Sequence, residues 1–186
     1  MVQFLNTQAS FSEIENIINR AEHKLVLISS NTQITRLLLQ KIYHASEHRS
    51  IDVTLVCRQD DIRPEEFAAL NQISRLEIFD LPDLHANCFY NEKTMVITSL
   101  NLYDYSQTNN RDMGVLITYD KDPGTFIAAF NETEYMMQLA TLVKVNMVLA
   151  RVNRQLAAPV GDVSFFDIQG GLKRSFPTFT KILVHR

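Results

Sequence analysis

Short apolar runs rich in β-branched residues alternate with amphipathic segments along the first 140 residues, and this alternation restricts the fold more than any other feature. An apolar run of four to eight residues predicts a strand, and apolar residues three and four apart predict a helix. Strands that alternate with helices predict an α/β domain, with a mixed β-sheet flanked by helices on both faces. No linker rich in Gly, Pro or Ser interrupts this pattern before about residue 140.

The alternation predicts individual elements with stated ranges. We expect strands at 24–29, 51–57, 76–79, 84–90, 94–98 and 113–118. We expect helices at 11–21, 34–48, 64–73, 126–140 and 142–156. Ser12 and Glu15 have the spacing of a capping box at the start of the first helix. Asn91-Glu92-Lys93 is typical of a hairpin turn between the two strands around it.

Length and composition are those of an ordinary globular protein. The chain has 186 residues, enough for a substantial core. No stretch approaches the run of about 20 apolar residues that a membrane helix needs, and residues 1–10 lack the basic and apolar regions of a signal peptide. Cys57 and Cys88 are therefore predicted to be reduced, partly buried thiols, with a role as small buried hydrophobic residues as the alternative, and we expect a cytoplasmic protein without membrane insertion.

The charges are unevenly distributed along the chain. Residues 1–143 carry 11 basic and 19 acidic side chains, whereas residues 144–186 carry seven basic and two acidic ones. A basic segment attracts phosphate backbones, so nucleic acid is one predicted partner. A solvated face or a protein contact is the alternative interpretation.

The stretch 84–101 contains the residues that predict a function. His85 lies at the head of one expected strand, and Ser99 and Asn101 follow the end of the next, beyond the hairpin. Antiparallel pairing brings these positions together, so we expect the three side chains to lie close to one another. An imidazole can attack phosphorus, and a hydroxyl and an amide can bind the non-bridging oxygens. The alternative is a structural histidine beside plain turn and cap residues.

This stretch resembles the half-site motif of the phospholipase D superfamily, which reads H-x-K, a hairpin with an acidic residue, and then G-S-x-N. His85, Ser99 and Asn101 match the histidine, serine and asparagine. The segment 109–114 resembles the one that supplies an acidic partner to the histidine. The resemblance covers roughly residues 10–140 and includes the order of strands and helices.

The resemblance implies a mechanism and an assembly. His85 would be the covalent nucleophile, Asp112 would orient it, and Ser99 and Asn101 would bind phosphate oxygens. The family combines two half-sites, and this chain has one, so the resemblance implies a homodimer with the two copies of His85 meeting at a two-fold axis. The implied activity is that of a phosphodiesterase, most plausibly a nuclease, which needs no metal or cofactor.

The resemblance also divides the chain. Residues 1–143 would form the phospholipase D-like domain, and residues 144–186 would form a basic appendage of helix and strand packed on it.

Three departures from the motif affect the predicted activity. Asn87 stands where the motif has lysine, so the catalytic cation is replaced by a neutral amide that can still donate to a phosphate. Thr98 stands where glycine is usual, which predicts crowding of the phosphate. The hairpin is one residue shorter, and Glu92 replaces aspartate at a position that mostly concerns the turn. A weakened or inactive domain that binds nucleic acid or phosphate is therefore the alternative function.

A second pattern suggests metal chemistry. The sequence His44-Ala-Ser-Glu-His48 has the spacing of an H-x-x-E-H zinc motif. No later helix offers an obvious glutamate to complete such a site. We interpret the segment as the solvated end of an amphipathic helix.

Overall fold

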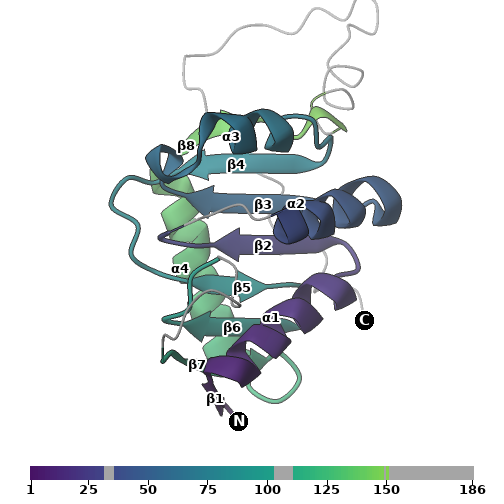
Figure 1. Cartoon of the computed structure of the whole chain (residues 1–186). Helices are drawn as coiled ribbons and strands as arrows, with labels where there is room; N and C mark the ends of the chain where they lie inside the picture. The colour runs from purple at the N-terminus through teal and green to yellow at the C-terminus, as the bar shows by residue number, and fades with distance from the viewer. Residues whose placement is uncertain (32–35, 103–110, 149, 151–186) are drawn as a thin grey trace, which may run out of the picture. The chain divides into compact units, whose positions relative to one another are not determined.

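The computed structural model describes residues 1–31, 36–102, 111–148 and 150. These residues belong to the first of two units into which the chain divides, residues 1–156 and 157–186. The first unit contains an eight-stranded mixed sheet with the strand order β1-β7-β6-β5-β2-β3-β4-β8 (Figure 1). The strands are β1 (Gln3–Asn6), β2 (Lys24–Ile28), β3 (Asp52–Cys57), β4 (Leu76–Asp80), β5 (Cys88–Tyr90), β6 (Thr94–Thr98), β7 (Met113–Thr118) and β8 (Thr141–Lys144).

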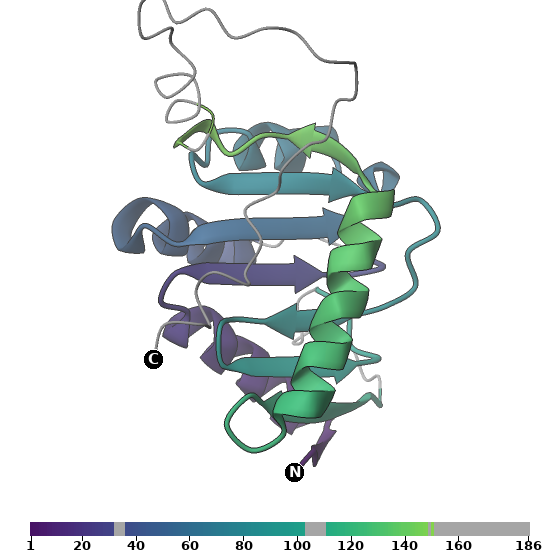
Figure 2. The ribbon, with the colours of Figure 1, turned by 180° about the vertical axis from the view of Figure 1, so that it is seen from behind.

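Helices cover both faces of this sheet. The described α-helices are α1 (Thr7–Arg20), α2 (Arg36–Tyr43), α3 (Pro64–Leu70) and α4 (Pro123–Leu139). Figure 1 shows α1, α2 and α3 on one face, and Figure 2 shows α4 crossing the other. The predicted α/β class with a mixed sheet is confirmed.

The central strands are buried on both sides because the chain supplies apolar residues to both faces. Leu25 and Leu27 of β2 pack toward α1 and α2, whereas Val26 and Ile28 pack toward α4. All four side chains are fully buried. A strand buried on both faces reads as a continuous apolar run, which is the pattern that predicted it.

The pairing brings several strand ends to one edge of the sheet. Strands β2, β3 and β4 are parallel, so their carboxyl ends lie together. Strand β5 runs antiparallel to β2, with Cys88 opposite Ile28. Strand β6 pairs antiparallel with both β5 and β7. The start of β5, the end of β6 and the start of β7 therefore lie at the same edge as the end of β2.

The amino-terminal segment differs from the prediction. Residues Gln3–Asn6 form β1, paired with β7, and α1 begins at Thr7. The Asn6 side chain caps this helix by accepting a 2.9 Å hydrogen bond from the N–H of Ala9. The predicted capping box at Ser12 and Glu15 is wrong because both residues lie inside the helix.

Two other predicted elements also differ. The strand predicted at 84–90 is regular only from Cys88 to Tyr90, so His85 lies in an irregular segment before β5. The helix predicted at 142–156 begins as a strand, because Thr141–Lys144 pairs antiparallel with β4. This strand crosses the predicted domain boundary at residue 143. The rest of the predicted appendage, from residue 151, lies outside the described residues.

Among the described residues, no helix has the length and apolar character needed to cross a bilayer.

Candidate functional site

The residues predicted to form the site lie at the sheet edge where β2 and β6 end and where β5 and β7 begin. His85 and Asn87 precede β5, Ser99 and Asn101 follow β6, and Asp112 precedes β7. Four of these five residues are connected by one hydrogen-bonded network, and among the described residues no hydrogen bond connects His85 to it.

His85 presents its imidazole to solvent. The preceding residue, Leu84, is buried, and its N–H donates a 3.0 Å hydrogen bond to the carbonyl of Leu81. This buried neighbour anchors the segment while the His85 side chain is exposed. Within the described part of the chain, the imidazole makes no hydrogen bond or ion pair. An unengaged, exposed imidazole is available as a nucleophile.

Asn87 lies inside the network and is only 6% exposed. Its Oδ1 accepts a 2.9 Å hydrogen bond from the N–H of Ser30, and the hydroxyl oxygens of Ser29 and Ser30 each lie 3.3 Å from it. Its Nδ2 donates to the carbonyl of Ser99 at 3.4 Å. The amide at the motif's lysine position therefore joins the end of β2 to the end of β6.

Ser99 and Asp112 form a direct pair. The Ser99 hydroxyl donates a 2.9 Å hydrogen bond to Oδ1 of Asp112 and accepts one from the N–H of Met113 at 3.2 Å. The N–H of Asp112 donates to Oγ1 of Thr7 at 2.9 Å, which fixes the start of β7 against α1. Among the described contacts, Asp112 forms no ion pair with His85. Its carboxylate instead accepts the hydrogen bond from Ser99.

Asn101 shares a partner with Asn87. The hydroxyl of Ser30 donates a 3.0 Å hydrogen bond to Oδ1 of Asn101. Its Nδ2 has no hydrogen-bond partner among the residues that the structure describes, and the residue is half-buried. The Asn101 amide therefore has two N–H groups available to an acceptor such as a phosphate oxygen.

Thr98, at the motif's glycine position, is turned into the sheet. Its hydroxyl donates to the carbonyl of Met113 at 2.8 Å and accepts from the N–H of Leu100 at 3.1 Å. The opposite residue is Gly114, where an added Cβ would lie 2.9 Å from Cβ of Thr98 and 2.9 Å from Oγ of Ser10. Glycine at 114 is thus what makes room for threonine at 98.

Glu92 fixes the far end of the hairpin. Its carboxylate accepts hydrogen bonds from the N–H groups of Glu22 at 3.2 Å, of His23 at 2.6 Å and of Lys24. Two of these donors lie in the connection between α1 and β2, and the third belongs to Lys24, the first residue of β2. The contacts agree with a role of Glu92 in the turn.

Sequence reasoning missed Ser29 and Ser30, which the structure places at the centre of the network. They directly follow β2, and ligand sites of open α/β sheets form beyond the carboxyl ends of parallel strands. The position of two hydroxyl residues at that point was the available signal.

Acidic and basic side chains are mixed in the connections beside this edge. Nε of Arg58 pairs with Asp61 at 2.8 Å, and Arg63 forms an ion pair with Glu66. Arg111, directly before Asp112, is exposed and has no ion-pair partner within the described ranges. Among the residues that the structure describes, Arg111 is thus the cation without an ion-pair partner that lies closest in sequence to the network.

Comparison with known proteins gives a match in structure alone. No family model matches the chain, and no curated protein matches its sequence. The structure is similar to Nuc from Salmonella typhimurium, a phospholipase D family member, with a TM-score of 0.58 and 15% identity over 78% of this chain and 99% of that one. NucT from Helicobacter pylori matches with a TM-score of 0.63 and 12% identity over 76% of this chain and 98% of that one.

A third similar structure is TrmBL2, an archaeal chromatin protein whose structure shows a novel mode of DNA binding. It matches with a TM-score of 0.53 and 13% identity over 76% of this chain and 53% of that one. The sheet order, the helices on both faces and these matches agree with the resemblance seen in the sequence. The chain therefore has the fold of the phospholipase D superfamily.

Proposed function

We propose that this chain is a metal-independent phosphodiesterase that cleaves nucleic acid as a homodimer, with His85 as the nucleophile. The observation that carries the proposal is the exposed, unengaged imidazole of His85 at the sheet edge that also holds Ser99, Asn101 and Asp112. A nucleophile beside neutral donors is suited to a phosphodiester, whose non-bridging oxygens accept hydrogen bonds.

The proposed reaction has two steps. A nitrogen of His85 attacks phosphorus, a P–N bond forms, and the P–O bond to the leaving group breaks. The leaving oxygen takes a proton from His85 of the second subunit. That second imidazole then removes a proton from water, the water oxygen attacks phosphorus, and the P–N bond breaks to release the phosphomonoester and restore both histidines.

The surrounding residues have separate roles in this proposal. The free N–H groups of Asn101 bind a non-bridging oxygen, and Arg111 supplies a positive charge. Asp112 acts through Ser99, whose hydroxyl it holds at 2.9 Å. Asn87 positions Ser30 and Ser99 through its own hydrogen bonds.

A second copy of the chain has a surface on which to pack. Phe4 of β1 and Ile97 of β6 both lie opposite Val115 of β7, one on each side of it. Met113 lies on β7, two residues before Val115. Phe4 is 65% exposed, Met113 is 66% exposed and Ile97 is 37% exposed. We call these three residues the apolar corner. It directly adjoins Asp112, so a partner that covers it brings its own site residues near this one.

Nucleic acid is favoured over a lipid substrate by charge. Residues 144–186 carry seven basic and two acidic side chains, and such a segment attracts a polyanion. The structurally similar TrmBL2 is a DNA-binding chromatin protein, which supports the same substrate class.

One observation favours a second function, which is phosphodiester binding without cleavage. The motif's lysine is replaced by Asn87, whose carbonyl oxygen and amide are both engaged inside the protein. Loss of even one neutral transition-state donor costs about 3 kcal/mol of barrier, and loss of a cation costs more.

Plasmid nicking in the presence of EDTA tests the two functions against each other. We compare the unchanged chain, His85→Ala and Asn87→Lys, and we measure binding of a labelled oligonucleotide by fluorescence anisotropy. Cleavage that disappears in His85→Ala supports the enzyme. Binding without cleavage, with nicking only in Asn87→Lys, supports the binding module. If none of the three proteins cleaves or binds, both proposals are wrong.

A further inference from the structure

The backbone on both sides of Asn101 is fixed by side-chain hydroxyls. The preceding residue, Leu100, is 5% exposed, and its N–H donates a 3.1 Å hydrogen bond to Oγ1 of Thr98. The following residue, Leu102, is 6% exposed, and its N–H donates at 3.0 Å to Oγ of Ser29. The two buried leucines therefore anchor the Asn101 backbone beside the ends of β6 and β2.

The Ser29 hydroxyl is committed to the backbone. Its oxygen accepts from Leu102, and its proton is donated to the carbonyl of Asn31 at 2.9 Å. A hydroxyl carries a single proton, so this contact uses the one donor that Ser29 has. Ser29 is also fully buried. Its role is therefore to hold the chain on either side of the site rather than to meet a ligand.

Ser30 holds the side chain of Asn101. Its hydroxyl donates a 3.0 Å hydrogen bond to Oδ1 of Asn101, and its backbone N–H donates at 2.9 Å to Oδ1 of Asn87. Both Ser30 and Asn101 are half-buried. Asn87 thus fixes the Ser30 backbone, and the Ser30 side chain fixes the Asn101 carboxamide.

The direction of the Asn101 carboxamide decides which kind of ligand it can bind. Its Oδ1 is an acceptor, and its Nδ2 carries two N–H donors. Because Ser30 occupies Oδ1, the donors are the groups left for a ligand. A half-turn of the amide would instead present the carbonyl oxygen, which repels a phosphate oxygen.

The contacts of Ser30 favour the observed direction over the reversed one. With the amide reversed, Nδ2 of Asn101 would donate to Ser30, and the Ser30 proton would have to turn to Oδ1 of Asn87. That oxygen lies 3.3 Å from the Ser30 hydroxyl and already accepts the Ser30 N–H. The reversed amide would therefore exchange a 3.0 Å hydrogen bond for a longer one to an occupied acceptor.

We propose that Ser30 is a positioning residue that fixes the Asn101 carboxamide with its N–H groups toward the ligand, so that Asn101 binds an anionic acceptor. The inference rests on the proposed function, in which this acceptor is a non-bridging oxygen of a phosphodiester. A donor that is already oriented needs no reorganisation when the ligand binds. The oriented amide supplies part of the anion binding that the motif's lysine would give at residue 87.

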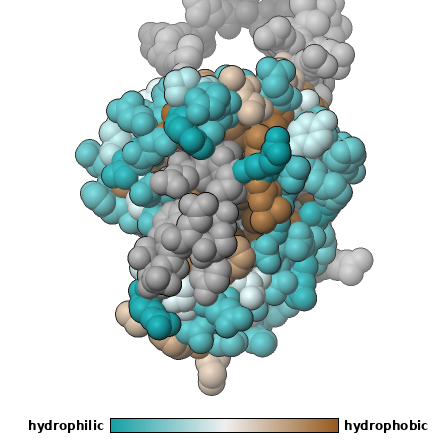
Figure 3. Space-filling view, in the orientation of Figure 1, coloured by the Kyte–Doolittle hydropathy of each residue, from teal (hydrophilic) through white to brown (hydrophobic). Residues whose placement is uncertain are grey.

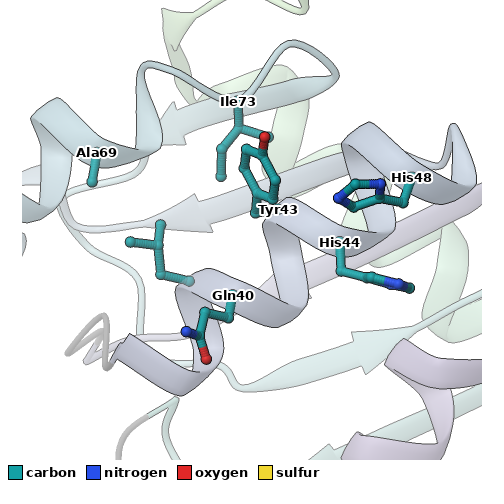
Figure 4. A pocket seen from close by; sticks show the side chains of 7 residues that line it. Gln40, Tyr43, His44, His48, Ala69 and Ile73 are labelled. Carbon is teal, nitrogen blue, oxygen red and sulfur yellow. The ribbon is translucent and has the colours of Figure 1, made fainter.

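The cavity between α2 and α3 is a poorer candidate for an anion. It has a volume of about 350 Å³, and no lysine or arginine lines it within the described part of the chain. It opens on a face that is mostly hydrophilic apart from an apolar strip (Figure 3). Figure 4 shows the exposed rings of His44 and His48 beside it, and its apolar lining includes Leu39, Ala69 and Ile73.

Side-chain NMR of the ¹⁵N-labelled full chain tests the positioning without any ligand. The Nδ2 resonance of Asn101 is identified by its loss in Asn101→Ala. We expect a rigid amide in the unchanged chain and in Ser30→Thr, which keeps the hydroxyl, and an order parameter below about 0.6 in Ser30→Ala. Ser12→Ala, at an exposed position of α1, is the control and should leave the amide rigid. An Asn101 amide that stays equally rigid in Ser30→Ala would overturn the proposal.

Fluorescence anisotropy with a labelled oligonucleotide tests the consequence for the ligand. We expect affinity to fall about fivefold in Ser30→Ala, which corresponds to one neutral hydrogen bond, and about tenfold in Asn101→Ala. The double variant should bind as Asn101→Ala does, because Ser30 acts through Asn101. Ser30→Thr should restore the affinity that Ser30→Ala loses. Additive losses in the double variant would contradict the proposal, since they would mean that the two residues act independently.

The two measurements separate this inference from the proposed function. If the unchanged chain binds neither the oligonucleotide nor inorganic phosphate, the proposed function is wrong. The order parameter of the Asn101 amide still decides the role of Ser30 in that case, because it is measured on the free protein. Loss of rigidity in Ser30→Ala alone supports the role, and equal rigidity in all the proteins refutes it.

Discussion

The backbone N–H of Ser30 donates a 2.9 Å hydrogen bond to Oδ1 of Asn87, the residue at the motif's lysine position. This contact joins the end of β2 to the segment before β5. It gives Asn87 a structural task that a lysine side chain, which has no acceptor, could not perform. The substitution thus changes both the charge of the site and the way in which its strands are held together.

Replacement of Asn87 by alanine is expected to destabilise the protein. It would leave the half-buried Ser30 N–H and the Ser99 carbonyl without this partner, at a cost of about 1 kcal/mol in the free energy of unfolding. Urea unfolding measures this difference. Asn131→Ala, on the exposed side of α4, is the control and should change stability by no more than about 0.5 kcal/mol. Equal effects of the two substitutions would contradict the structural role.

Glu92→Gln should weaken the hairpin's attachment to the connection before β2. The carboxylate accepts from three backbone N–H groups, and an amide offers one acceptor oxygen and places its own N–H groups against the remaining donors. Because hydrogen bonds to a charged group are worth about 1.5–3 kcal/mol each, we expect a loss of about 2 kcal/mol. Thermal unfolding of this variant is compared with Glu132→Gln, whose side chain is exposed; a smaller loss in Glu92→Gln than in that control would count against the contact.

The sequence was sufficient to predict those elements whose residue pattern is local. Strand β2 and the β5–β6 hairpin were predicted because a continuous apolar run and a polar turn identify them without any partner. Strand β1 was missed, because a four-residue edge strand becomes regular only by pairing with β7, more than 100 residues away. Residues 141–144 are apolar enough for a helix or a strand, and pairing with β4 decides between them.

The candidate site was predictable as a location but not as a network. Antiparallel pairing across the hairpin predicted that His85, Ser99 and Asn101 lie close together at one edge. Among the described residues, hydrogen bonds connect Ser99 and Asn101 through Asn87 and Ser30, and none of them includes His85. The partner of Asp112 could not be predicted, because the choice between His85 and Ser99 depends on side-chain directions that no spacing specifies.

Met113→Glu is expected to separate the subunits. The substitution places a charge in the apolar corner, and a charge buried without a partner in an interface is strongly unfavourable. Sedimentation velocity should show a dimer for the unchanged chain and a monomer for the variant, with loss of nicking in the monomer. Tyr135→Glu, at an exposed position on α4, serves as the control and should stay dimeric. A Met113→Glu variant that remains a dimer would place the interface elsewhere.

The two thiols should be inert in the native protein. Burial raises the pKa of both the Cys57 and the Cys88 thiol from 9.0 to about 12. Both thiols therefore stay protonated at pH 8, and the reactive thiolate is about a thousandfold scarcer than in an exposed cysteine. A colorimetric disulfide reagent should label neither residue in buffer. It should label both in about 8 M urea, where the protein is unfolded. Rapid labelling without urea would show that the thiols are accessible.

The inert thiols make a direct test of the two-fold site available. His85→Cys introduces an exposed cysteine, which a short bismaleimide can join to its counterpart if the two copies of residue 85 face each other. We predict a covalent dimer on a denaturing gel for His85→Cys and none for the unchanged chain, whose cysteines are buried. A His85→Cys protein that sediments as a dimer yet yields only monomer after cross-linking, or that never dimerises, would contradict the proposal that two copies of His85 form one active site.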